Sequence, residues 1–265
     1  MTHYSFEFYG FTFFGIILLR YLICAGGTQL FLDKMVTAVA IAPEAAPEQQ
    51  LSGWWLTAMA KVGIVATMFQ DIQLSVLSSV VFALSAAAIA SAYDAGITRL
   101  YADIHQYPLW YLGASYLGAI VLQDVYFYFV HRLFHHRLLF RWWHQGHHRS
   151  QPTTPWTSFA FDPPEAIAHS LFLVGIVFVL PLHFITLIAV LSTMTVWAVV
   201  NHLDLDRLPV NFPHHWCGRW FTGPAHHAIH HHHYALHYGL YFTFWDRQLG
   251  TQSPKYTQEL ADVTH

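Results

Sequence analysis

Residues 131–148 read HRLFHHRLLFRWWHQGHH, and six of these eighteen residues are histidines. If the stretch is helical, His131 and His135 project from one face, because side chains four residues apart lie one turn apart. The HxxHH pattern that begins at His144 has the same property. The spacing therefore predicts that these imidazoles gather on short helical faces.

The HxxHH pattern returns later in the chain with His227, His230 and His231. Together, the HxxxH pair and the two triplets can bring eight neutral imidazoles into a small volume. A tetrahedral zinc site is complete with four ligands, so the surplus of nitrogen indicates two metal ions. Imidazole without thiolate suits iron, copper or zinc.

An ordinary structural role is the alternative interpretation for any single histidine in a His-rich chain. We adopt it for the isolated ones, namely His3, His105, His169, His183 and His265. The HxxxH pair and the two HxxHH triplets are called the first, second and third histidine boxes, in chain order. Three such boxes, two of them identical in pattern, are much harder to obtain by chance. The set as a whole therefore predicts a metal centre.

The composition places this centre in a membrane protein. The 265 residues are 55% hydrophobic and only 10% charged, with a mean hydropathy of +0.35, whereas about a quarter of the residues of soluble domains are charged. A net charge of −3 and the lack of a basic patch give no indication of a nucleic acid partner. Cys24 and Cys217 form no CxxC motif, so no redox disulfide or iron–sulfur cluster is indicated.

The apolar segments predict one all-α, multi-pass transmembrane domain that takes up residues 1–265 and has about four main spans. We expect the spans at residues 8–32, 72–93, 108–130 and 166–200, a loop at 33–50, and at 51–70 either an interfacial segment or a short amphipathic helix. The His-rich stretches 131–165 and 201–252 lie outside these spans. The start of the chain lacks the positive region of a cleavable signal peptide, so we expect the first span to remain.

The position of the boxes constrains the topology. Both HxxHH triplets can share a metal pair only if they lie on one side, so the apolar segment 166–200 must be a hairpin, interrupted near Pro181. Arginines cluster around the first two boxes, and the positive-inside rule makes that side cytoplasmic. These arginines are Arg132, Arg137, Arg141 and Arg149.

Asp124 lies seven residues before His131 and on nearly the same helical face. An isolated carboxylate in an apolar helix is expensive and needs a partner. Metal-binding histidines commonly donate their second ring N–H to a carboxylate. Asp124 either supports a ligand in this way or forms a purely structural pair, and both alternatives remain open.

Three stretches, DVYFYFVHRLFH (124–135), HQGHH (144–148) and HHAIHHHHYALHYGLYFTFWDRQLGT (226–251), carry a family resemblance. They resemble the fatty acid hydroxylase/sterol desaturase superfamily, and the last stretch is most similar to sterol C5-desaturases. The resemblance covers about residues 115–252. The chain departs from the sterol desaturase pattern at His237, where an HYG sequence replaces the usual NYG.

The resemblance implies a helical transmembrane domain with a cytosolic, His-rich helical cap over a non-haem diiron centre. We expect this cap at residues 131–165 and 201–252. The resemblance also implies O2 as the oxidant and electrons from a separate carrier, cytochrome b5-like or ferredoxin-like. Eight histidines match the family's ligands, and two more resemble its additional ligands. The eight are His131, His135, His144, His147, His148, His227, His230 and His231, and the two are His202 and His226.

We therefore expect a membrane oxidoreductase that uses two iron ions and O2 to desaturate or hydroxylate a lipid, foremost a sterol desaturase. A fatty acid, methylsterol or alkylglycerol hydroxylase is the near alternative, because it would share the ligand set. A metal transporter or storage protein is the alternative from another class. A transport pathway would spread histidines and carboxylates through the spans, and here the spans carry few ionisable residues.

Overall fold

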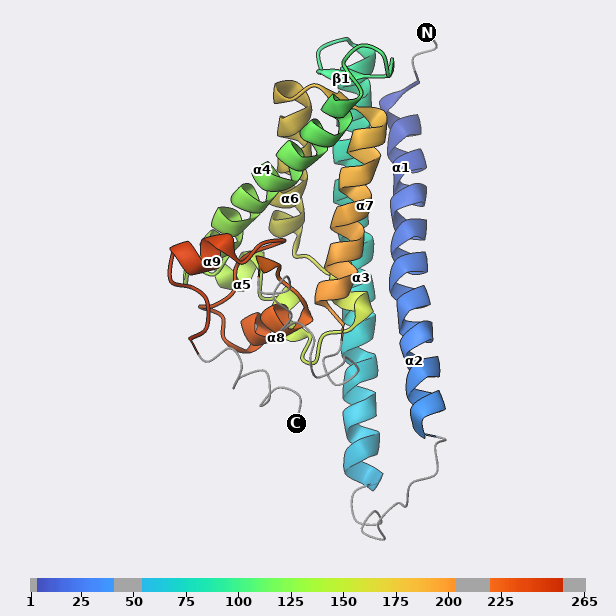
Figure 1. Cartoon of the computed structure of the whole chain (residues 1–265). Coiled ribbons are helices and arrows are strands. Elements are labelled where there is room, and N and C mark those ends of the chain that lie inside the picture. Colours follow the sequence, from blue (N-terminus) through green and yellow to red (C-terminus); the bar gives the residue numbers. More distant parts are fainter. Residues whose placement is uncertain (1–3, 41–53, 204–219, 255–265) are drawn as a thin grey trace.

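The computed structural model describes residues 4–40, 54–203 and 220–254, and helices make up most of this part of the chain. Figure 1 shows the long helices running side by side and three short helices gathered on one side of them, namely α5 (Phe140–Trp143), α8 (Pro224–His232) and α9 (Phe244–Gln248). The predicted all-α architecture with a separate histidine-rich cap is confirmed.

The N-terminal half forms two long helices. The first is continuous through α1 (Phe6–Tyr21), the π-helical turn η1 (Leu22–Gly26) and α2 (Gly27–Ala40), and the second is α3 (Trp54–Asp94). The loop predicted at 33–50 was therefore wrong up to Ala40, and residues 41–50 lie outside the described residues.

The short amphipathic helix predicted as one alternative for 51–70 was also wrong. Residues from Trp54 onward belong to α3, whose backbone remains helical through Lys61 and Gly63, while residues 51–53 lie outside the described part. A single glycine costs a helix only about 1 kcal/mol relative to alanine. The long apolar sequence on its C-terminal side offsets that cost.

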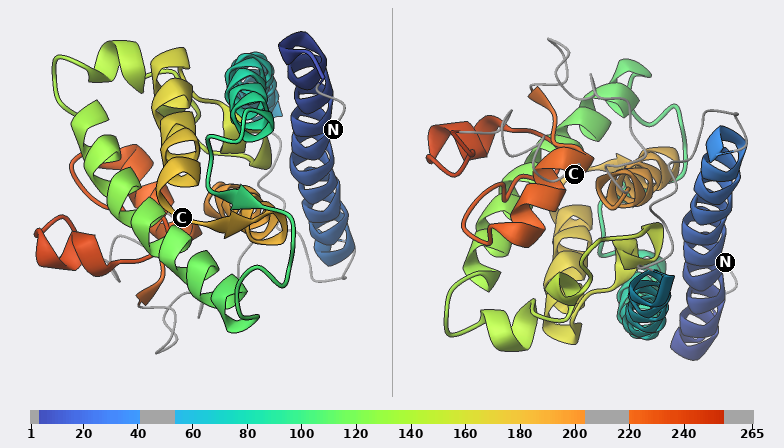
Figure 2. Two further views of the ribbon diagram at one scale, coloured as in Figure 1. Left: turned by 90° about the horizontal axis from the view of Figure 1, so that it is seen from above. Right: turned by 90° about the horizontal axis from the view of Figure 1, so that it is seen from below.

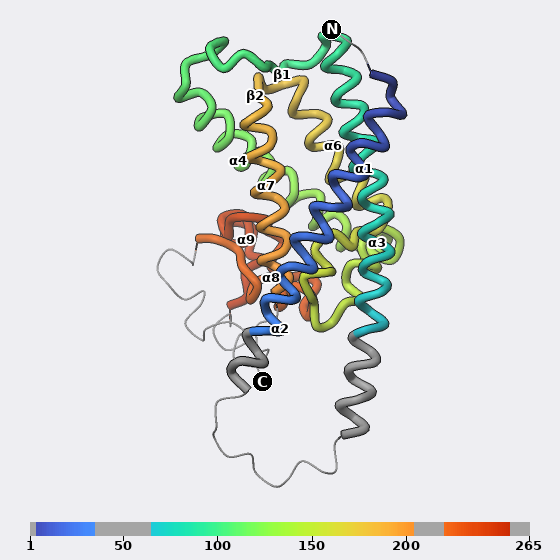
Figure 3. The backbone as a smooth tube through the Cα atoms, turned by 90° about the vertical axis from the view of Figure 1, so that its right-hand side faces the viewer, coloured from blue at the N-terminus to red at the C-terminus, as the bar shows by residue number. Residues whose placement is uncertain are grey.

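The predicted hairpin is present as α6 (Pro163–Val179) and α7 (Phe184–Asn201). Pro181 separates the two helices, since proline lacks a backbone N–H and disfavours the helical conformation of the residue before it. The connecting strand β2 (Leu182–His183) pairs in parallel with β1 (Leu100–Tyr101). Figure 3 shows this pair at the end of the helices opposite α8.

The described residues include three helices that are long and apolar enough to cross a membrane. They are Phe6–Lys34, Val65–Asp94 and Phe184–Asn201. The predicted span at 108–130 lies in α4 (Trp110–Phe134), whose sequence includes Asp124 and Arg132. The number of crossings therefore remains a prediction. The three long apolar helices nevertheless support a membrane-spanning fold.

Helix α6 lies between α3 and α4 and packs against both (Figure 2). One apolar core joins α4, α6 and α7 and includes the fully buried Val177 and Leu182. A second core joins α1 and α3 to Phe159 of the short helix η3 (Pro155–Phe159). The two cores fix the helices on which the cap rests.

A polar face of α3 anchors the segment that follows the second histidine box. The Asp71 carboxylate accepts hydrogen bonds from Ser150 Oγ at 2.5 Å and Thr157 Oγ1 at 2.7 Å. Ser78 Oγ donates to the Phe161 carbonyl at 3.1 Å. A buried carboxylate is stable only when it is paired in this way, so α3 and the cap are joined by polar as well as apolar contacts.

Asp124 performs the equivalent task for the C-terminal part of the cap. Its Oδ1 accepts hydrogen bonds from the backbone N–H groups of Tyr241 at 2.8 Å and Phe242 at 3.1 Å. The Tyr241 hydroxyl donates to the neighbouring Gln123. Of the two alternatives left open for Asp124, these contacts correspond to the structural pairing and not to support of a histidine.

The fold predicts that the 97–103 loop and the cap are exposed on opposite sides of a membrane. Single cysteines at Ile97 and Arg137, both exposed positions, in a background without Cys24 and Cys217 should react with an impermeant thiol reagent from opposite sides only. By the positive-inside rule, the cysteine at position 137 should react from the cytoplasm. Labelling of both cysteines from the same side would contradict this topology.

Candidate metal centre

Nine histidines converge in the cap and form two groups. The first group contains His131, His135, His144, His148 and His230, and the second contains His147, His202, His227 and His231. Within each group, the nitrogens that face one another all lie within 4.8 Å. Both groups therefore have the donor type, number and spacing of a metal site.

The two groups adjoin each other. The rings of His144 and His147 are 5.2 Å apart between centroids, and those of His148 and His231 are 4.4 Å apart. Each of these pairs joins a member of the first group to a member of the second. The arrangement is therefore one centre with room for two ions.

Four different parts of the fold supply the ligands. His131 and His135 come from the C-terminal end of α4, and His147 and His148 from the 3-10 turn η2 (His147–Arg149), which follows α5 (Phe140–Trp143). His202 ends α7. The third box lies on α8 (Pro224–His232), whose helical spacing points His227 and His231 into the second group and His230 into the first.

Burial keeps these imidazoles neutral. It lowers the pKa of His147, His148 and His231 well below the usual value, and it lowers the pKa of His230 to about 4. Neighbouring histidines lower the pKa of the first three further. A neutral imidazole is the form that binds metal.

Backbone carbonyls determine which ring nitrogen carries the proton. Nδ1 of His131 lies 3.1 Å from the Tyr238 carbonyl, and Nδ1 of His147 lies 3.2 Å from that of Ala160. A carbonyl oxygen only accepts hydrogen bonds, so each Nδ1 must be the donor. In a neutral ring, Nε2 then carries the lone pair. His202 and His230 are held in the same way by the carbonyls of Ala198 and Leu236.

These lone pairs face one another. Nε2 of His147 is 3.4 Å from Nε2 of His202, although the N–H of each ring points to a carbonyl on its other side. Two neutral nitrogens in this orientation have no proton to share, and burial denies them water. A cation among the lone pairs removes the conflict, so the donor set fits a pair of imidazole-bound metal ions.

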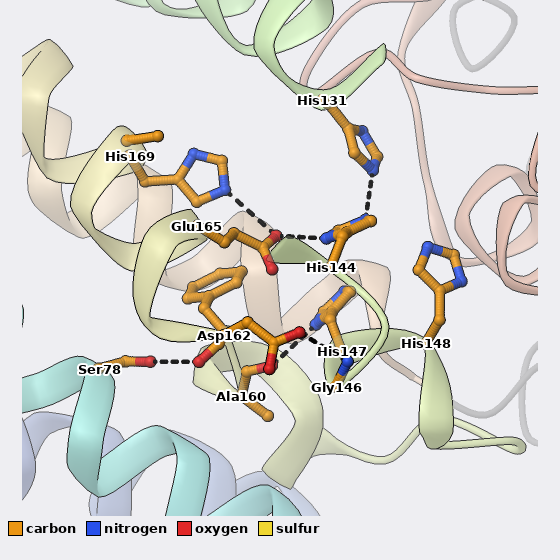
Figure 4. Close-up of polar contacts among 12 residues, drawn as sticks. Ser78, His131, His144, Gly146, His147, His148, Ala160, Asp162, Glu165 and His169 are labelled. Atoms are coloured by element: carbon orange, nitrogen blue, oxygen red, sulfur yellow. Dashed lines mark hydrogen bonds and ion pairs between the residues drawn. The ribbon is translucent and has the colours of Figure 1, made fainter. Parts of the chain in front are cut away.

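Gly146 allows the tight turn of the second histidine box. Its backbone N–H donates to Asp162 Oδ2 at 2.6 Å (Figure 4). A Cβ at this position would collide with the same carboxylate. Asp162 precedes α6 without capping it, and its carboxylate instead fixes the turn that presents His147 and His148.

Asp246 organises the last part of the cap in a similar way. Its carboxylate accepts hydrogen bonds from the backbone N–H groups of Tyr238 at 2.8 Å and Gly239 at 3.0 Å, and from Thr251 Oγ1 at 2.7 Å. The Tyr238 carbonyl is the acceptor that orients His131. The WDRQLGT stretch therefore positions a ligand without supplying one.

The structure brings together nine of the ten histidines expected from the sequence, including His202, and does not bring in His226. His226 is buried outside both groups, with its ring 5.0 Å from that of His237. The sequence could not exclude it, because consecutive residues of a helix point about 100° apart and the rotation of α8 is set by packing.

Glu165 is the residue at the centre that the sequence interpretation missed. It lies at the start of α6, and its Oε1 is 2.8 Å from His144 Nδ1 and 3.4 Å from His169 Nε2 (Figure 4). His169, interpreted from sequence as an ordinary histidine, belongs to neither ligand group. An acid followed four residues later by a histidine, at the edge of an apolar segment, was the available signal.

The sequence model of the fatty acid hydroxylase family matches residues 116–251, just over half of the chain, and the chain belongs to that family. The matched region contains all nine converging histidines. The family resemblance stated from the motifs is thereby confirmed.

Similar proteins include sterol-modifying enzymes. The chain is 35% identical to the lathosterol oxidase of Rattus norvegicus over 154 residues, which cover 57% of the chain and 50% of that protein. It is 30% identical to the Delta(7)-sterol 5(6)-desaturase ERG3B of Gibberella zeae over 156 residues, 59% of the chain and 47% of that protein.

A third relative, methylsterol monooxygenase 1 of Rattus norvegicus, is 33% identical over 167 residues, which cover 61% of the chain and 55% of that protein. The chain thus spans about half the length of the curated relatives that it matches. No solved structure matches the chain.

The ligand assignment predicts the effect of removing one histidine. His147→Ala should weaken metal binding by at least about 10–100-fold, the loss that even an outer partner of a ligand causes, while the protein stays folded in the membrane. His105→Ala is the control, because His105 is exposed and belongs to neither group. Elemental analysis should give close to two metal ions per chain for wild type and control. A full metal complement in His147→Ala would contradict the assignment.

The HYG departure predicts a backbone effect. His237 has a φ of +57°, in the left-handed region where asparagine is favoured among non-glycine residues and β-branched residues are strained. The free energy of unfolding of His237→Val should therefore be about 1–3 kcal/mol lower than that of His237→Asn. Neither variant keeps the imidazole ring that accepts the hydrogen bond from Ser253 N. Equal stability in denaturant titrations would refute this explanation of the motif.

Proposed function

We propose that this chain is a membrane-bound non-haem diiron oxidoreductase that uses O2 to desaturate or hydroxylate a lipid, foremost as a sterol desaturase. The observation that carries the proposal is the pair of adjoining histidine groups, in which the facing lone pairs of His147 and His202 favour a bound cation. Membership of the fatty acid hydroxylase family and similarity to sterol C5-desaturases support iron and a lipid substrate.

The residues of the cap have separable tasks in this proposal. The two histidine groups hold one iron ion each, and imidazole without thiolate suits iron through changes of oxidation state. The carbonyls of Tyr238, Ala160, Ala198 and Leu236 keep the metal-facing nitrogens free of protons. The pair of iron ions supplies the oxidising power that amino acid side chains lack.

Aromatic side chains lie around the first group. The rings of Tyr234 and Phe140 lie 4.7 Å and 5.6 Å from that of His148, and Tyr238 lies 5.3 Å from His135. A dry site strengthens electrostatic interactions and protects reactive species from side reactions with water. An apolar wall of this kind also suits a lipid substrate that enters from the bilayer.

Desaturation and hydroxylation consume the same number of electrons from an external donor. In desaturation, a CH2–CH2 unit, O2, two electrons and two protons give a C=C bond and two waters. In hydroxylation, a C–H bond and the same reactants give an alcohol and one water. Both need two electrons from outside, and we propose a cytochrome b5-like or ferredoxin-like carrier that docks on the cytoplasmic face of the cap.

The hydroxylase remains a second candidate because the chain is similar to methylsterol monooxygenase 1 as well as to sterol desaturases. The two reactions use the same type of centre, and the position of the lipid hydrogen relative to the metals decides between them. The fate of oxygen separates them experimentally.

The proposal predicts an O2-dependent change in a lipid. Membranes that contain the iron-loaded chain should be given ¹⁸O2, reduced cytochrome b5 or ferredoxin, and either a Delta(7)-sterol, a methylsterol or a fatty acid. Desaturation should remove two hydrogens from the lipid without ¹⁸O, and hydroxylation should add one ¹⁸O atom, as measured by mass spectrometry. Membranes with His147→Ala provide the background. Identical lipid profiles in the two membranes with every substrate and donor would contradict the proposal.

A further inference from the structure

Glu165 is a buried carboxylate directly joined to a metal-facing histidine. It is 1% exposed, and its Oε1 lies 2.8 Å from Nδ1 of His144. The Nε2 of the same histidine faces Nε2 of His131 at 3.0 Å, inside the first group. One imidazole therefore connects the carboxylate on one side to the proposed metal position on the other (Figure 4).

His169 holds Glu165 from the opposite side. It lies one turn further along α6, and its Nε2 is 3.4 Å from the same Oε1. The His169 ring is itself fixed, because it stacks on Phe127 at 5.0 Å with an interplanar angle of 12° and contacts Phe161 at 5.1 Å. The carboxylate is thus held in place by a residue that belongs to neither ligand group.

The charge balance of the site indicates a role for the contact between Glu165 and His144. Divalent ions in a shell of neutral imidazoles leave a buried excess of positive charge. Within the described residues, Glu165 is the one carboxylate in contact with a member of either group. Its second oxygen has no hydrogen-bond partner among these residues, so packing alone leaves the carboxylate poorly compensated. A nearby cation offsets the free-energy cost of burying the Glu165 charge.

We propose that Glu165 is a positioning residue for the metal ion of the first histidine group only. Its contact with Nδ1 of His144 holds that ring with Nε2 toward the first group, and its charge offsets part of the metal charge through the ring. The proposal rests on the diiron centre of the proposed function and adds an asymmetry to it, since the second group has no such carboxylate within the described residues.

Asp124 provides a matched control. It is also a buried carboxylate on an apolar helix of the same protein, at 2% exposed. Its oxygens accept hydrogen bonds from the backbone of Tyr241 and Phe242 and contact no histidine of either group. Asp124→Asn therefore changes a buried charge without changing a contact of the metal centre.

Cobalt(II) titration of the full chain in detergent, after removal of metal by chelation, tests the proposal by visible absorption. Wild type should bind two equivalents. Glu165→Gln keeps the shape of the side chain and removes its charge, and it should weaken one equivalent about 10–100-fold, the usual cost of losing an outer partner of a ligand, while the other equivalent is unchanged. Asp124→Asn should bind both equivalents as wild type does.

Two results would overturn the proposal: unchanged binding of both equivalents by Glu165→Gln, or equal weakening of both, which would indicate a general structural role. If Glu165→Gln fails to fold by circular dichroism, His169→Phe takes its place. This variant keeps the stacked ring but removes the group that holds Glu165, so the same single equivalent should weaken, and unchanged binding would overturn the proposal. Failure of wild type to bind two equivalents would instead refute the diiron centre.

Discussion

Neutral imidazoles whose lone pairs face one another in a buried volume impose the main constraint on this fold. The contact between Nε2 of His147 and Nε2 of His202 is unfavourable for neutral rings alone and favourable around a cation. Four of the nine ring orientations depend on backbone carbonyls, from Ala160, Ala198, Leu236 and Tyr238. The ligand set therefore exists only once distant segments have packed, which couples metal binding to folding.

The apolar helices solve the problem of bringing these segments to one place. About 80 residues separate His148 from His230, yet their Nε2 atoms are 3.1 Å apart. The α6–α7 hairpin leaves the cap and returns to it, and the pairing of β1 with β2 secures its far end. Asp71 on α3 and Asp124 on α4 then attach the cap to the helices through hydrogen bonds to its backbone and hydroxyl groups. The membrane domain thus acts as the frame on which the metal centre is assembled.

The sequence predicted the histidine boxes and the hairpin from spacing and hydrophobic length, and the family resemblance of its motifs predicted the cap. It did not distinguish His226 from His227, since only the packed rotation of α8 decides which ring points into the second group. It also left two roles open for Asp124 and overlooked Glu165, an acid at the edge of an apolar segment. The direction of a side chain depends on tertiary contacts that spacing does not contain.

Two contacts in the cap, each between a glycine N–H and an aspartate carboxylate, explain motif residues that bind no metal. In HQGHH, the N–H of Gly146 reaches the Asp162 carboxylate, and in HYG, the N–H of Gly239 reaches the Asp246 carboxylate. A Cβ on Gly239 would come within 2.9 Å of Asp246 Oδ2 and 2.5 Å of the Phe242 carbonyl, so only glycine permits the approach. Each carboxylate thereby holds the backbone next to a ligand or next to the carbonyl that orients one. The glycines and aspartates of the boxes are required for the same reason as the histidines, because a ligand binds metal only in the orientation that its neighbours fix.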